Sequence, residues 1–157
     1  MTDAVATDLR RSRGWTVGWR LVYAILRVLD PILRVSWWSG GMGITSRLSV
    51  RGRRSGRSRS VLVGLLRVED RLYVGHPNGE VDWTRNLDAA RMALIKRPGL
   101  PELEMRAVRL PHGRERAAAI GITAQQQPFP GNVLYAAARR HILAVGVYFR
   151  LEPMDPS

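Results

Sequence analysis

The sequence of 157 residues contains no cysteine and a single lysine, Lys96. Without cysteine there is no disulfide, no thiolate nucleophile and no cysteine-ligated zinc or iron–sulfur site. With one lysine among 25 basic residues, nearly all positive charge sits on arginine, whose planar guanidinium suits two-pronged contacts with phosphate or carboxylate. These absences exclude sulfur-based chemistry and favour recognition of an anion.

Acidic residues are also scarce. Asp and Glu together number 13, which gives a formal net charge of +12. Such an excess favours an anionic partner: nucleic acid, phospholipid, or a phosphorylated or polycarboxylate small molecule. The length fits one domain, and a hydrophobic content of 45% supports a sizeable core.

No uncharged run is long enough to cross a membrane, because the apolar segment 15–38 is interrupted by Arg20, Arg27 and Arg34. A spacing of seven places these arginines on one ridge of an amphipathic helix, opposite an aliphatic face. Such a helix either docks on its own domain or lies at a membrane surface, where its four tryptophans would favour the boundary with water.

The remainder alternates β-rich runs with helical ones. Strands are expected at 47–52, 59–68, 71–76, 92–95, 103–110 and 144–153, with a two-residue hairpin connection at Glu69-Asp70. Helices are expected at 85–91, 113–127 and 132–143. The pattern predicts an α+β domain over 44–151 built on a small barrel closed by antiparallel hairpins, preceded by a tail and helix over 1–38.

Familiar catalytic motifs are missing. The stretch GRRSGRS is one residue short of a P-loop and lacks its lysine, and no G-x-S-x-G elbow occurs. His76, His112 and His141 are too scattered for a local metal motif. We therefore expect no metal ion and no catalytic side chain, so that any redox chemistry would come from a cofactor.

The stretch VRGRRSGRSRSV, residues 50–61, carries five arginines separated only by glycine and serine. It lies between apolar β-runs, which indicates a folded turn and not a disordered arm. Gly52 and Gly56 permit a tight backbone, whose amides, with Ser55 and the arginines, would form an anion-binding nest. The alternative is a solvated hairpin end.

Two linked motifs resemble the deazaflavin-dependent nitroreductase family. The first comprises Gly52, Arg53, Arg54, Ser55, Gly56 and Arg59, and the second, in GEVDWTRNL, comprises Trp83, Asn86 and Leu87. The closing YFRLEP also resembles the last strand of that family, so the likeness runs from about Ile44 to Leu151.

This resemblance implies a split β-barrel related to the pyridoxamine phosphate oxidase fold, which binds FMN in other members, and the use of coenzyme F420. It implies that the turn holds the phosphate of the coenzyme, while the segment from Gly79 to Asn86 lies along the deazaflavin and its tail. As a departure from the family pattern, Glu80 and Asp82 would face that anionic tail. Trp83 would pack on the ring, the Asn86 amide would bond the polar edge of the ring, and Tyr135 would line the substrate pocket. For Trp83 and Asn86, a core anchor and a helix cap are the alternatives.

The implied reaction is hydride transfer from the reduced deazaflavin to a small-molecule acceptor such as a quinone or a nitro compound. Non-catalytic binding of a fatty acid is the alternative within the same fold. Nucleic acid is disfavoured, because no aromatic residue interleaves the arginines as a stacking platform. We expect a cytoplasmic protein, with peripheral contact to the inner face of the membrane through 15–38 as a hypothesis and a homodimer left open.

Overall fold

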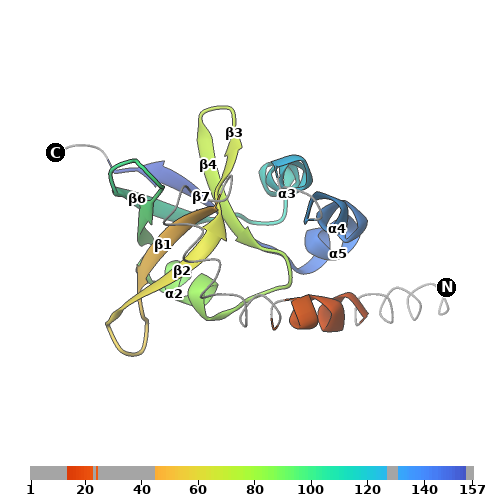
Figure 1. The fold of residues 1–157 in the computed structure, drawn as a ribbon, viewed down its shortest axis with the longest axis horizontal. Helices are drawn as coiled ribbons and strands as arrows, with labels where there is room; N and C mark the ends of the chain where they lie inside the picture. Colours follow the sequence, from red (N-terminus) through yellow and green to blue (C-terminus); the bar gives the residue numbers. More distant parts are fainter. Residues whose placement is uncertain (1–13, 23, 25–44, 127–130, 155–157) are drawn as a thin grey trace.

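The fold is given by a computed structural model, which describes residues 14–22, 24, 45–126 and 131–154 (Figure 1). Residues 23 and 25–38 of the expected amphipathic helix lie outside the described residues. The described chain forms a curled sheet, with helices packed to one side and at one end.

One antiparallel sheet of seven strands forms the centre of the molecule, in the order β2-β1-β5-β6-β7-β4-β3. The strands are β1 (Thr45–Arg51), β2 (Ser58–Gly64), β3 (Leu66–Val68), β4 (Arg71–His76), β5 (Met92–Lys96), β6 (Leu103–Arg109) and β7 (Val147–Pro153). The sheet curls so that β2 returns toward β4, although the two do not pair. The result is the half-closed, split barrel expected from the sequence.

Alternation along the strands separates the inside of the barrel from its outside. In β1, Leu48 and Val50 are buried while Ser49 and Arg51 face outward. Because successive side chains of a strand point to opposite faces, this period of two fixes which face of β1 closes the core. The fully buried Phe149 of β7 belongs to the same core.

Four further helices follow β1 in the chain: α2 (Asp82–Ala90), α3 (Arg114–Gln126), α4 (Gly131–Ala137) and α5 (Arg139–Val145). Helix α2 places the fully buried Leu87 in the barrel core. Helices α3, α4 and α5 gather on one side of the sheet (Figure 1) and build a second core around Ile142 and Tyr148.

Residues 14–22 and 24 are helical and dock on this second core. Trp19 is only 3% exposed, and its ring meets that of Tyr135 edge-on at a centroid distance of 5.3 Å. The side-chain amide of Asn78 donates to the carbonyl of Thr16 at 3.4 Å. For this part of the chain the docked alternative is confirmed. Within the described residues, no helix is long and apolar enough to cross a membrane.

Two expected elements are each divided. The run 59–68 forms β2 and β3, because β2 pairs with β1 whereas β3 pairs with β4, and the chain changes partner at Leu65. The expected helix 132–143 becomes α4 and α5, which meet at the buried Ala138. In both cases the break serves tertiary packing that local sequence does not reveal.

Candidate functional site

The turn joining β1 to β2 is a compact, hydrogen-bonded loop. The amide of Gly52 donates to the carbonyl of Arg57 at 2.8 Å, and the amide of Gly56 donates to the carbonyl of Gly52 at 2.9 Å. A Cβ on Gly52 would lie 3.2 Å from the Arg57 oxygen, and Gly56 has a φ of +66°. Gly56 is therefore favoured by its left-handed backbone, and a side chain at position 52 would crowd the turn.

Strand register decides where the arginine after the turn points. Arg59 pairs with Val50, and Val61 pairs with Leu48. Directly opposed residues lie on the same face of a sheet, and Val50 and Leu48 face the core. Arg59 and Val61 consequently lie on the inner face of β2, at the mouth of the barrel.

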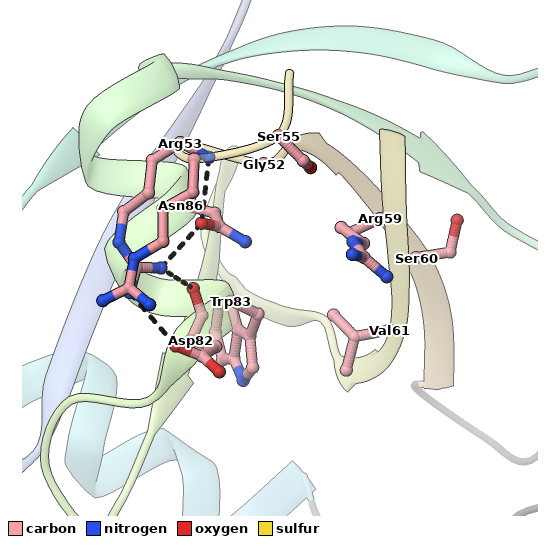
Figure 2. Close-up of a pocket in the computed structure, with 10 residues that line it drawn as sticks. Gly52, Arg53, Ser55, Arg59, Ser60, Val61, Asp82, Trp83 and Asn86 are labelled. Atoms are coloured by element: carbon pink, nitrogen blue, oxygen red, sulfur yellow. Dashed lines mark hydrogen bonds and ion pairs between the residues drawn. The ribbon is translucent and has the colours of Figure 1, made fainter. Parts of the chain in front are cut away.

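Helix α2 provides the opposite wall. Its first turn is fixed by Thr84, whose hydroxyl donates to the carbonyl of Val81 and accepts from the amide of the same residue, both at 2.9 Å. Trp83 and Asn86, one turn apart, both line the space between α2 and β2 (Figure 2). Trp83 also packs against the barrel core, so the core-anchor alternative and the pocket role coexist. Asn86 lies mid-helix, so the helix-cap alternative is wrong.

The space enclosed is a cavity of about 420 Å³. Its lining residues are Gly52, Arg53, Arg54, Ser55, Arg59, Ser60, Val61, Asp82, Trp83 and Asn86. A volume of this size accommodates a small ligand or one portion of a larger one. The walls combine guanidinium and hydroxyl groups at the turn with an indole and a valine deeper in, which suits an anionic group joined to an apolar ring.

Arg53 does not face the cavity as an unpaired cation. Its guanidinium donates to Asn86 Oδ1 at 2.8 Å through Nη1 and to Asp82 Oδ1 at 3.1 Å through Nη2. Its backbone amide donates to the same Asn86 oxygen at 3.2 Å. Figure 2 shows these bonds as a bridge from the turn to α2.

The other arginines of the turn remain available to an anion. No carboxylate among the described residues pairs with Arg54, Arg57 or Arg59, and of these Arg54 and Arg59 line the cavity. The backbone amides of Arg54 and Ser55 likewise have no acceptor within the described part of the chain. Two amides and two guanidiniums thus form the donor set at the mouth of the cavity.

The two acidic residues expected to face an anionic tail are both neutralised. Glu80 pairs with Arg109 at 2.7 Å and with Arg85 at 3.5 Å, and hydrogen bonding to Arg109 lowers the pKa of the Glu80 carboxyl. Asp82 pairs with Arg53. Neither carboxylate opposes an incoming anion with an unbalanced charge.

Behind the indole of Trp83 lies His76, with ring centroids 6.4 Å apart and edge-on. Burial lowers the pKa of His76 from 6.5 to about 4, although a hydrogen bond with the Gly79 carbonyl opposes the shift. His76 is therefore a neutral support for Trp83 at neutral pH.

Most of the residues predicted from the sequence come together here. Gly56 shapes the turn without lining the cavity, and Gly79, with a φ of +81°, lies in the bend before α2. Tyr135 lies away from this cavity, in the second core against Trp19. Ser60 and Val61 were not predicted, although the alternation of β2 from Arg59 would have indicated Val61. Among the described residues, no group of three potential metal ligands occurs.

Comparison with known proteins gives structural likeness only. No family model matches the sequence, and no curated protein matches it significantly. A conserved hypothetical protein from Mycobacterium tuberculosis superimposes with a TM-score of 0.56 at 10% identity, over 69% of this chain and 72% of that one.

Two other solved structures carry informative names. An F420-H2 dependent reductase matches with a TM-score of 0.53 at 16% identity, over 69% of this chain and 94% of that one. A candidate pyridoxamine 5′-phosphate oxidase from Listeria innocua matches with a TM-score of 0.50 at 11% identity, over 86% of this chain and 94% of that one. At such identities the likeness shows the fold, and the protein is a split β-barrel of the pyridoxamine phosphate oxidase type, a fold it shares with an F420-dependent reductase.

Proposed function

We propose that this protein is an oxidoreductase that binds coenzyme F420 in the cavity between the β1–β2 turn and α2. The observation that supports this function is the donor set at the cavity mouth, where Arg54 and Arg59 carry unpaired charge beside two unbonded amides. The reduced deazaflavin, when bound, supplies a hydride, and the acceptor is an electron-poor small molecule such as a quinone or a nitro compound.

The residues present fit this coenzyme at both ends of the cavity. Arg54, Arg59 and Ser55 would hold its phosphate, because charged hydrogen bonds from a guanidinium to a phosphate oxygen are among the strongest available. Trp83 and Val61 would contact the apolar face of the ring system. The protein would thus bind and orient, and no side chain of the cavity is needed as an acid or a base.

A fatty acid fits the same cavity less well. Its carboxylate would pair with Arg59, but Trp83 and Val61 are the two large apolar side chains that the lining offers to a long acyl chain, and they lie beside the ion pair of Arg53. Titration with oxidised F420, FMN and a long-chain fatty acid separates these functions. Selective binding of F420 supports the reductase, and selective binding of the fatty acid refutes it in favour of a carrier.

A second proposal concerns the membrane, and the helix at residues 14–22 and 24 favours it. Its inner face docks through Trp19, whereas Val17 and Leu21 on the opposite face are 65% and 63% exposed, with Arg20 beside them. From Leu9 to Leu29 the sequence holds no acidic residue. An exposed apolar face flanked by arginine suits an anionic lipid surface, where a lipid-soluble acceptor would be within reach.

Substitution of Val17 and Leu21 by glutamate tests this contact without disturbing the docked face. The double variant should lose sedimentation with vesicles containing anionic phospholipid while F420 affinity stays within about twofold of the parent. Unchanged sedimentation would refute membrane contact through this face and leave the proposed reductase function intact.

A further inference from the structure

The two adjacent arginines of the turn are used differently. Arg54 carries no ion pair among the described residues, whereas the side chain of Arg53 is 23% exposed and is engaged by Asp82 and Asn86. An anion entering the cavity would compete with Asp82 and Asn86 for the Arg53 guanidinium. It meets no such competition at Arg54 or Arg59.

Asn86 is the residue that Arg53 orients. Its Oδ1 accepts two hydrogen bonds, one from the Arg53 guanidinium at 2.8 Å and one from the Arg53 amide at 3.2 Å. An amide has one oxygen and one nitrogen on the same planar group, so fixing the oxygen also fixes where the nitrogen points.

The nitrogen so fixed is directed into the cavity. Asn86 is only 8% exposed, and within the described residues its Nδ2 has no acceptor. In Figure 2 this nitrogen points away from Arg53, toward the space between α2 and Arg59. This donor borders the cavity and has no protein acceptor among the described residues, so it is free to bond an acceptor on a ligand.

We propose that Arg53 is a positioning residue that locks the Asn86 amide, and that Asn86 Nδ2 is a neutral donor that reads an acceptor on the ring portion of the bound coenzyme. The anion is held by Arg54 and Arg59 without Arg53. The identity of the coenzyme in this proposal rests on the proposed function. The hydrogen bonds by which Arg53 locks the Asn86 amide, in contrast, belong to the turn and α2 and do not depend on the coenzyme.

Asp82 completes the lock from the helix side. Its carboxylate and its backbone carbonyl both accept from Arg53, at 3.1 and 3.3 Å. The carboxylate is 86% exposed, so this pair adds little stability. Its contribution is geometric, because the flat guanidinium reaches Asp82 and Asn86 at once. A lysine in place of Arg53 keeps the charge but offers a single point of contact.

The first test examines the lock without any ligand. In a ¹⁵N spectrum, the side-chain amide signal of Asn86 is assigned by its loss in Asn86→Ala. Arg53→Lys should move this signal, and the neighbouring Arg54→Lys, as the matched control, should leave it in place. An unmoved signal in Arg53→Lys would overturn the lock whether or not the protein binds F420.

The second test separates the anion from the ring, with inorganic pyrophosphate and oxidised F420 as the two probes. Arg53→Gln combined with Asp82→Asn removes the ion pair without changing the net charge of the cavity. Pyrophosphate affinity should stay within about twofold of the parent, whereas it should fall about tenfold in Arg59→Ala, the scale of a lost charged hydrogen bond. A tenfold loss of pyrophosphate in the paired variant would make Arg53 an anion ligand and refute its assignment as a positioning residue.

F420 affinity should fall about tenfold in Arg53→Lys and in Asn86→Ala, and the double variant should be no weaker than either, because both changes remove the same contact. Additive losses would show that Arg53 acts independently of Asn86. If the parent protein binds pyrophosphate but not F420, the proposed function fails, while the spectral and pyrophosphate results still decide the role of Arg53.

Discussion

Replacement of Arg59 by alanine should weaken coenzyme binding without weakening the fold. Arg59 lies on the inner face of β2 opposite Val50, lines the cavity, and has no carboxylate partner among the described residues. Its removal therefore costs the free protein no ion pair. In the complex it removes one charged hydrogen bond, worth about 1.5 to 3 kcal/mol, which corresponds to a loss of roughly ten- to 150-fold in affinity.

The assay is a titration of oxidised F420 into parent and variant at fixed ionic strength, with thermal unfolding measured in parallel. Arg57→Ala is the matched control, because Arg57 belongs to the same turn, is exposed, and does not line the cavity. It should lose only the long-range attraction, which salt screens over about 8 Å. Equal losses in the two variants would refute a site at the cavity and leave only a general basic surface. An unchanged affinity in Arg59→Ala would remove the turn from the coenzyme site.

Two further predictions concern the supports of the site. Trp19→Ala should lower the free energy of unfolding by about 3 kcal/mol, typical of a buried tryptophan. The control Val17→Ala, on the exposed face of the same helix, should change this free energy little. Equal effects of the two variants in chemical denaturation would contradict the docked helix. Burial lowers the pKa of His76 to about 4 in the folded protein, from its ordinary value of 6.5. The unfolded chain therefore takes up this proton first as pH falls, so stability should decline between pH 6.5 and 4 by up to about 3 kcal/mol. The difference in unfolding free energy between parent and His76→Gln, followed across that window, should shrink as pH falls, and a constant difference would contradict the buried neutral histidine.

The sequence predicts a strand best where turn-forming residues or proline mark both of its ends. Strand β4 matches the expected 71–76 at both ends, because Glu69-Asp70 turns the chain before it and Pro77 follows it. The division of 59–68 was not predictable in the same way, since nothing local distinguishes a residue that pairs with β1 from one that pairs with β4.

The candidate site was predictable as a set of residues but not as a set of contacts. The turn and the start of α2 were identified together, and the structure brings them to one cavity. The partner of Arg53, however, is Asp82, 29 positions away, and only the packing of α2 against the β1–β2 hairpin creates that pair. Tyr135 illustrates the same limit, because its ring faces Trp19 from a helix whose docking no local pattern encodes.

The same packing decides which charges of the chain are paired and which are not. Composition gives an excess of twelve positive charges and says nothing about where they act. In the described structure, several carboxylates are held by arginines. Glu80 pairs with Arg109 at 2.7 Å and Asp82 with Arg53 at 3.1 Å. Arg150 pairs with both Glu115 and Glu152, at 2.8 and 2.9 Å.

Exposed ion pairs of this kind add little to stability. Because the two charges of a pair cancel, a pair contributes little to the electric field around it. Arginines without a carboxylate partner also lie elsewhere on the described surface, Arg139 and Arg140 among them. The turn is a denser group, with Arg51, Arg54, Arg57 and Arg59 within nine positions and no such partner among the described residues. This dense group of unpaired arginines lies where the tight backbone of Gly52 and Gly56 also leaves two amides unbonded. An anion drawn to this end of the barrel by the field finds donors already in place, and the one arginine of the turn that is neutralised, Arg53, is the one that ties the turn to α2.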